Sequence, residues 1–127
     1  MNKRTSTVKE LRNRVAIEPI ETMNNETNIV LTEAVFYILL VLHKPLHGYG
    51  IMQETEIMSG GRLKLSAGTL YGALSSLLEK KWIIELPMEE GSRRKEYEIT
   101  SLGKEVAKIE LSRLEELVRN GNSIIER

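Results

Sequence analysis

The stretch Leu65–Lys81 constrains the fold of this chain more than any other segment, because it predicts one helix with two very different faces. Ser66 is a suitable N-cap, and no proline interrupts the strong helix formers that follow it. Leucines at helical spacing predict a buried stripe: Leu70, Leu74, Leu77 and Leu78. The opposite face consists of small residues: Gly68, Gly72, Ser75 and Ser76. A helix with such a face can lie close to another surface, either the major groove and phosphates of DNA or a second helix.

The charges of the chain balance, with 18 basic and 18 acidic residues among 127. A uniformly basic protein that coats nucleic acid is therefore excluded, and any DNA binding has to come from local patches. The chain contains no cysteine, and all 18 acidic residues are glutamates. Thiolate metal sites, Ser–His–Asp catalysis and EF-hand loops are thus not available in their usual form. We expect no catalytic residues, no metal site and no cofactor.

The length of the chain predicts one domain with a modest core. The longest apolar run, Ala34–Leu42, is about half as long as a membrane span, and no signal-peptide pattern precedes it. We therefore expect a cytoplasmic protein without a membrane segment. With Thr32 as its N-cap, the apolar run predicts a helix that is buried on most sides, against its own domain and a second subunit.

Residues 1–28 predict a basic, partly ordered N-terminal arm. Thr7 and Glu10 have the spacing of a capping box, which favours a short helix that docks on the domain or on a partner subunit. A frayed terminus is a second interpretation. Translation that starts at Met23 is a third.

A second short helix is predicted at Gly48–Met58, and the run Ser59–Gly61 ends it. This helix and the one at Leu65–Lys81 together have the pattern of a helix-turn-helix. His43 and His47 are four residues apart, but Pro45 between them prevents a shared helix face. A packing or capping role is therefore favoured over a metal site.

After Lys81 the period of the apolar pattern changes from helical to two, which predicts a half-buried strand. In this strand the apolar residues Trp82, Ile84 and Leu86 alternate with Ile83 and Glu85.

The run Glu89–Ser92 predicts a turn, in which Gly91 supplies backbone freedom. The return strand is expected to begin with Arg93, Arg94 and Lys95 and to direct Tyr97 and Ile99 toward the core. A β-hairpin with cations at its tip is called a wing. We expect these cations to contact phosphates.

The segment Ser101–Ile125 predicts one long helix with two apolar stripes. The first has the spacing of a coiled coil: Ala107, Leu111, Leu114, Val118 and Ile125. The second lies about 110° around the helix: Leu102, Val106, Ile109, Leu117 and Ile124. Packing on its own domain needs only one stripe, so we expect a homodimer. Its dimerisation residues would be Leu111, Leu114, Val118 and Ile125.

Four short motifs, in this order and spacing, resemble the PadR family of bacterial transcriptional regulators. They are His47-Gly48-Tyr49-Gly50-Ile51, Gly68-Thr69-Leu70-Tyr71-Gly72-Ala73-Leu74, Arg93-Arg94-Lys95-Glu96-Tyr97 and Thr100-Ser101-Leu102-Gly103. The resemblance covers roughly residues 32–105 and implies a winged helix-turn-helix domain with a C-terminal dimerisation helix. It also implies a homodimer that binds a palindromic operator on double-stranded DNA, usually as a repressor.

The resemblance implies a mainly α fold with a small β-hairpin, divided into three parts. These are an N-terminal arm (1–28), a winged helix-turn-helix domain (29–100) and a dimerisation helix (101–127). Short members of the family can hold planar aromatic effectors with a tryptophan of the C-terminal helix. This chain has its only tryptophan at Trp82, so it lacks the residue that such a site uses, and the identity of any effector stays open.

The leading hypothesis is a DNA-binding repressor. Its expected DNA-binding residues are Lys64, Ser66, Thr69, Tyr71, Gly72, Ser75, Arg93, Arg94 and Lys95. A winged-helix module that binds only other proteins is the alternative, because a fold does not fix function. An enzyme is disfavoured, since the sequence offers neither a nucleophile–base pair nor a phosphate loop.

Overall fold

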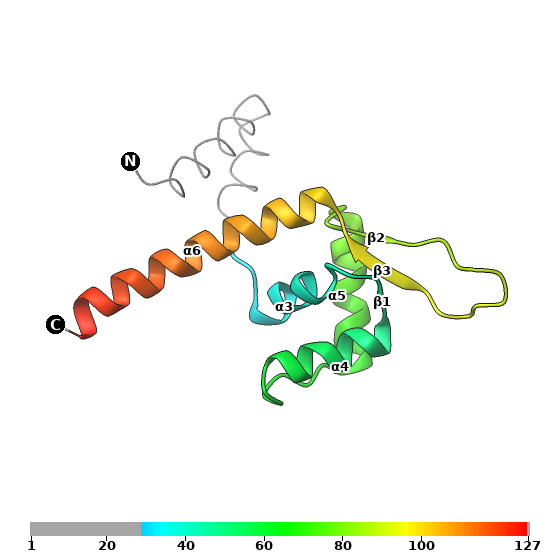
Figure 1. Ribbon diagram of the computed structural model, residues 1–127, viewed down its shortest axis with the longest axis horizontal. Helices are drawn as coiled ribbons and strands as arrows, with labels where there is room; N and C mark the ends of the chain where they lie inside the picture. Colours follow the sequence, from blue (N-terminus) through cyan, green and yellow to red (C-terminus); the bar gives the residue numbers. More distant parts are fainter. Residues whose placement is uncertain (1–28, 127) are drawn as a thin grey trace, which may run out of the picture. The chain divides into compact units, whose positions relative to one another are not determined.

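The computed structural model describes residues 29–126, and the predicted N-terminal arm lies outside them (Figure 1). In chain order the elements are α3 (Glu33–Val41), β1 (Leu46–His47), α4 (Gly48–Met58), α5 (Ala67–Glu79), β2 (Ile83–Glu85), β3 (Glu96–Ile99) and α6 (Ser101–Ile125). Residues 31–107 form one compact unit, and α6 continues into a second unit from Lys108 onward. The predicted fold class, mainly α with a small β part, is confirmed.

Helix α3 begins and ends within one residue of the predicted apolar run. The Thr32 hydroxyl oxygen caps it by accepting a hydrogen bond of 3.2 Å from the Val35 backbone N–H. Ile38, Leu39 and Val41 are buried, and no residue of 34–42 is exposed. The expected burial against its own domain is thus confirmed, and the contact with a second subunit stays a prediction.

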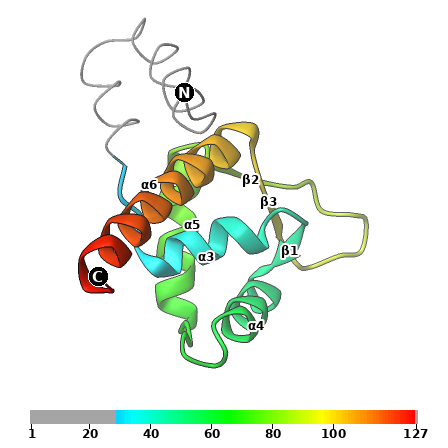
Figure 2. The same ribbon diagram turned by 60° about the vertical axis from the view of Figure 1, so that its left-hand side comes forward.

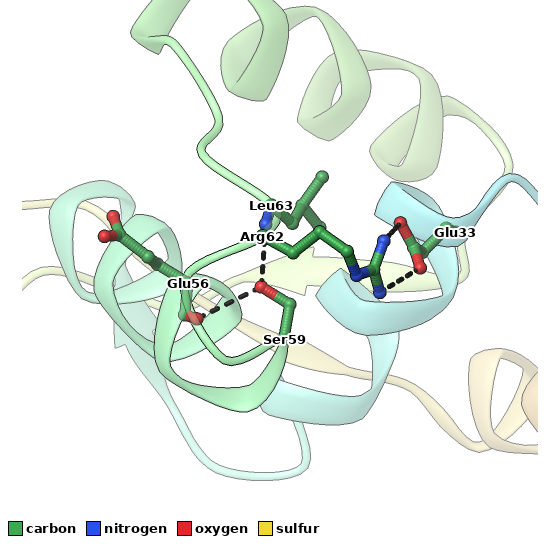
Figure 3. A network of polar contacts seen from close by, with 5 residues as sticks. All are labelled: Glu33, Glu56, Ser59, Arg62 and Leu63. Carbon is green, nitrogen blue, oxygen red and sulfur yellow. Dashed lines mark hydrogen bonds and ion pairs between the residues drawn. The ribbon is translucent and has the colours of Figure 1, made fainter.

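Helix α4 has the predicted bounds, and two glycines with positive φ end the turn that follows it. Gly60 and Gly61 have φ angles of 67° and 84°, in the left-handed region that favours glycine. Figure 3 shows how this turn is held. The Ser59 hydroxyl accepts a hydrogen bond from the Leu63 N–H at 2.8 Å and donates one to the Glu56 carbonyl at 3.1 Å.

An ion pair joins this turn to the start of α3 (Figure 3). The Arg62 guanidinium donates two hydrogen bonds, of 2.8 and 2.5 Å, to the Glu33 carboxylate. The hydrogen bond from Arg62 holds the pKa of Glu33 below its ordinary value. The geometry is bidentate, which is the strongest arrangement of an arginine and a carboxylate.

The core of the first unit lies among α3, α4 and α5, with the sheet at its edge (Figure 2). Its fully buried apolar side chains come from each of these parts: Ile38, Leu39, Leu42, Ile51, Leu70, Leu74, Leu77 and Ile83. Burial of one such side chain contributes about 1.5–3 kcal/mol relative to exposure. The core therefore fixes how α5 is presented to solvent.

The sheet has three antiparallel strands in the order β1-β3-β2, where the sequence predicted two. The additional strand, β1, pairs Leu46 with Tyr97 and His47 with Glu96. A two-residue strand is too short to show alternation, so no periodicity could have predicted it. It ties the segment before α4 to the wing, which we define as β2, β3 and the loop of residues 86–95 between them.

In the first wing strand, the buried isoleucine is not the one that belongs to the predicted apolar set of Trp82, Ile84 and Leu86. Ile83 is the buried residue, at 1% exposure, and it pairs with the buried Ile99, whereas Ile84 is 46% exposed. Because two isoleucines are adjacent, the alternating pattern fits either phase. The predicted start of the return strand was wrong, since β3 begins at Glu96 and the three cations lie in the loop before it.

Helix α6 has the predicted bounds, but the row of residues that it buries differs from both predicted stripes. Gly103, Val106, Ala107 and Glu110 are buried, and Leu102 is 36% exposed. Glu110 is 1% exposed and accepts hydrogen bonds of 2.9 and 2.6 Å from the Arg113 guanidinium. This buried charge was missed because an apolar pattern does not register a glutamate that an arginine neutralises.

Candidate DNA-binding surface

Helix α5 begins with a side-chain cap and divides cleanly into a core side and a solvent side. The Ser66 hydroxyl accepts a hydrogen bond of 3.2 Å from the Thr69 N–H and donates one of 3.0 Å to the Thr69 hydroxyl. Leu70, Leu74 and Leu77 are buried, as predicted. The exposed residues of the other side form what we call the open face: Gly68, Thr69, Gly72, Ser75 and Ser76.

The two glycines of the open face have no neighbour that would require glycine. A Cβ atom placed on Gly68 or Gly72 would meet nothing within 4 Å. A glycine inside a helix lowers stability by about 0.5–1 kcal/mol relative to alanine. The described residues therefore give no packing reason for glycine at these positions.

Tyr71, which the sequence assigned to the groove side, also has a structural contact. Its side chain is 50% exposed, and its hydroxyl lies where a Cβ atom on Gly48 would be. Gly48 is the first residue of α4, so the Tyr71 ring connects α5 to the start of α4. A Cβ atom at position 48 would therefore displace the end of the Tyr71 side chain, which is half exposed and can move.

The wing loop extends away from the helices and carries the three cations (Figures 1 and 2). Gly91, with φ 84°, forms its turn, and the Ser92 hydroxyl accepts a hydrogen bond of 3.3 Å from the Arg94 N–H. Arg93, Arg94 and Lys95 are all exposed. The Arg94 Nη1 atom lies 3.3 Å from His47 Nε2.

The junction between β1 and α4 thus contacts both predicted parts of the surface. His47 contacts the wing through Arg94, and Gly48 accommodates Tyr71 of α5. The sequence reasoning missed both as site residues, because it weighed His47 only as a packing or capping residue against a metal ligand. Lys64, in contrast, is exposed in the connector before α5, with no recorded contact to the wing among the described residues.

The base of the wing is apolar and holds one perturbed group. Tyr97 is 5% exposed, and burial, with smaller contributions from Glu85 and Tyr71, raises the pKa of its hydroxyl. Tyr97 therefore stays neutral and packs, and it is not a candidate acid or base.

Of the residues predicted for dimerisation, three are largely exposed on α6. The exposed fraction is 49% for Leu111, 61% for Val118 and 82% for Ile125, while Leu114 is half-buried. Within residues 29–126 no cluster of three or more metal-ligating side chains occurs. No helix in this part of the chain has the length and hydropathy that a membrane crossing requires.

A winged helix-turn-helix with this arrangement is typical of proteins that regulate transcription, and comparison with known proteins supports that class. The model of the PadR-like transcriptional regulator family matches residues 38–109. This match covers more than half of the chain. The chain therefore belongs to the PadR-like family of transcriptional regulators, as its four motifs indicated, and this family is not one of enzymes.

Two curated relatives are similar over about half of the chain. A protein X of Lysinibacillus sphaericus is 41% identical over 68 residues, and a 37.1 kDa protein of the Streptomyces fradiae transposon TN4556 is 44% identical over 62 residues. The matched regions span 62% and 17% of these two proteins.

Solved structures of similar fold cover more of the chain. A PadR family transcription regulator from Clostridium difficile has a TM-score of 0.63 at 24% identity, over 74% of this chain and 99% of its own. A PadR-like transcription factor from Bacteroides fragilis has a TM-score of 0.59 at 28% identity, over 71% of this chain and 87% of its own. These similarities confirm the winged-helix fold.

Proposed function

We propose that this protein is a sequence-specific DNA-binding regulator that acts as a homodimer on a palindromic operator, most simply as a repressor. The observation that supports this best is the open face of α5, whose glycines have free space above them. The groove of DNA admits one helix, and a face of small residues lets a helix approach another surface closely. Ser66, Thr69, Tyr71, Gly72 and Ser75 would face the groove.

Phosphate contacts would come from the cations of the connector before this helix and of the wing loop. Lys64 precedes α5, and Arg93, Arg94 and Lys95 lie in the wing loop. Local cations of this kind are what a chain with balanced charge needs for binding to DNA. A bacterial regulator that binds DNA would work in the cytoplasm, where the DNA lies.

The homodimer is supported by the exposed apolar residues of α6. Leu111, Leu117, Val118, Ile124 and Ile125 are each about half exposed or more. Exposed apolar residues that recur along one helix favour an interaction surface. A second copy of α6 is the partner that its coiled-coil spacing favours.

A protein-interaction module is the second candidate. Exposed apolar residues on α4 favour it, with Tyr49 at 61% and Ile57 at 73% exposure. Such residues could bind another protein instead of lying beside DNA.

A gel-shift titration separates the two candidates. The probe is the DNA upstream of the protein's own gene, with a scrambled duplex of equal composition as control. DNA binding predicts a shifted band at much lower protein concentration for the upstream DNA. Absence of a shift on both duplexes would overturn the proposal and favour the interaction module.

A further inference from the structure

His47 occupies a fixed position between two elements of the domain. It is the second residue of β1 and the N-cap of α4, yet its side chain makes no capping hydrogen bond. Its ring lies over the first turn of α4, because a Cβ atom on Gly50 would be 3.5 Å from the His47 Nδ1 and Cε1 atoms. The backbone and this packing together orient the ring, so its Nε2 atom has a defined direction.

That direction is toward the wing. The Arg94 Nη1 atom lies 3.3 Å from His47 Nε2. A guanidinium can only donate, so Nε2 is the acceptor and the ring proton is on Nδ1. Glu96 is the cross-strand partner of His47, and Arg94 precedes it by two residues, which places Arg94 diagonally across the β1–β3 pair.

In the part of the chain that the structure describes, the two cations beside Arg94 in the wing loop lack a contact of this kind. Arg93 and Lys95 are exposed, and neither has a recorded polar partner among residues 29–126. Arg94 is held by two contacts, its backbone N–H by Ser92 and its guanidinium by His47. Among the described residues, Arg94 is thus the cation of the wing loop whose side chain has a contact that orients it before a ligand binds.

We infer that His47 is a positioning residue that orients the Arg94 guanidinium for a backbone phosphate of duplex DNA. This inference rests on the proposed DNA binding. A long side chain that is already ordered loses less conformational freedom on binding. His47 supplies that order as a hydrogen-bond acceptor.

A double-mutant cycle on the upstream duplex tests this role. His47→Ala should weaken binding roughly three- to tenfold, the range that corresponds to ordering one long side chain on binding. The loss should be equal on scrambled DNA. In an Arg94→Ala background, His47→Ala should cause no further loss, because the residue that it orients is absent.

The salt dependence separates positioning from direct contact. Arg94→Ala should flatten the slope of log Kd against log salt by roughly one unit, since one phosphate contact is lost. His47→Ala should leave the slope unchanged, because every cation is retained. A flatter slope for His47→Ala would show that His47 itself neutralises a phosphate, which would overturn the inference.

Matched substitutions keep the test independent of folding. The glutamine amide can bring an oxygen close to the position of Nε2, whereas the asparagine amide is one carbon shorter. His47→Gln should therefore bind like the wild type and His47→Asn like His47→Ala, at equal thermal stability. If His47→Ala does not fold, the comparison of His47→Gln with His47→Asn tests the inference in its place. Loss of stability in parallel with loss of affinity would mean that His47 has only a structural role.

His43→Gln is the control for loss of a histidine. The His43 Nδ1 atom contacts the Leu39 and Leu40 carbonyl oxygens, at 3.1 and 3.0 Å, and neither of these residues belongs to the wing loop. DNA binding should therefore be unchanged by this substitution. If the wild type binds DNA and His47→Ala binds equally well, the positioning role is wrong and the proposed function stands. If the wild type binds no DNA, both fail.

Discussion

Two glycines of α6 differ in the space around them: Gly103 is crowded by backbone atoms, whereas Gly121 is open. A Cβ atom on Gly103 would overlap the Trp82 carbonyl oxygen, and the Gly103 N–H donates a hydrogen bond of 3.0 Å to the Thr100 hydroxyl. Backbone approaches backbone here, so no flexible side chain can move aside. A Cβ atom on Gly121, in contrast, would meet nothing within 4 Å.

These two glycines predict stability changes of opposite sign. Gly103→Ala should lower the free energy of unfolding by about 1–3 kcal/mol, as overpacking does. Gly121→Ala should raise it by about 0.5–1 kcal/mol, because alanine is the better helix former. Urea denaturation at one fixed protein concentration measures both. Equal signs would contradict the close approach at Gly103.

At the scale of elements, the Arg62–Glu33 pair joins the turn after α4 to the start of α3. The hydrogen bond from Arg62 lowers the pKa of Glu33 in the folded state. The unfolded chain therefore binds this proton more tightly than the folded protein does. The resulting stabilisation is complete above the unfolded pKa and is lost as the pH falls through the lowered folded pKa.

Glu33→Gln should accordingly lower the thermal midpoint at neutral pH, and the difference from wild type should shrink as the pH falls below about 4. Thermal denaturation over this range measures the effect. Glu54→Gln is the control, since Glu54 makes a single exposed contact of 3.5 Å with Lys44 and should change little. A difference that is independent of pH would contradict the role of the ion pair.

The wing predicts an effect on affinity without an effect on specificity. Arg93→Ala combined with Arg94→Ala should weaken binding about equally on upstream and scrambled DNA, because phosphates carry no sequence information. Each lost contact should flatten the log–log salt dependence by roughly one unit. Fluorescence anisotropy at several salt concentrations measures both quantities. Unchanged affinity and slope would mean that these cations are only solvated.

Helices could be predicted from the sequence much better than the sheet. Caps and glycines mark helix ends locally, so Thr32, Ser66 and the pair Gly60–Gly61 placed three boundaries closely. Strand β1 has two residues and exists only through its pairing with β3, which is a tertiary contact. The adjacent Ile83 and Ile84 likewise left open which face of β2 is buried, because only the pairing with β3 decides it.

The candidate site shows the same division between local and long-range signals. The open face of α5 could be read from the spacing of Gly68 and Gly72, because helical geometry places both away from Leu70. The contact of His47 with Arg94 joins residues 47 positions apart, and no pattern within one segment contains it. The buried Glu110 was missed similarly, since its neutralisation by Arg113 depends on side-chain geometry.

For the whole molecule, the exposed apolar residues of α6 predict a homodimer. Leu111→Glu with Leu114→Glu should give a monomer or an aggregate, because charges would replace apolar side chains in the seam. Sedimentation at micromolar concentration measures the oligomeric state. Arg119→Glu introduces the same charge at an exposed position beside the seam and should leave the dimer intact. A wild-type protein that sediments as a monomer would contradict the dimer.

The central claim is that the open face of α5 lies in the groove of DNA. Gly72 is near the middle of that face, and the space above it is empty. A leucine there should be accommodated by the free protein, whereas in a complex it would hold the helix away from the groove floor. An alanine adds only one methyl group and improves the helix by about 0.5–1 kcal/mol.

The most direct test is the affinity of Gly72→Leu and Gly72→Ala for the upstream DNA, measured by gel shift beside their thermal midpoints. Gly72→Ala should be as stable as the wild type or more so, and Gly72→Leu should fold and dimerise but lose specific binding. Unfolding of Gly72→Leu would mean that this face packs against protein, as an interaction module would. A Gly72→Leu protein that folds and binds DNA like the wild type would contradict the assignment of α5 as the recognition helix.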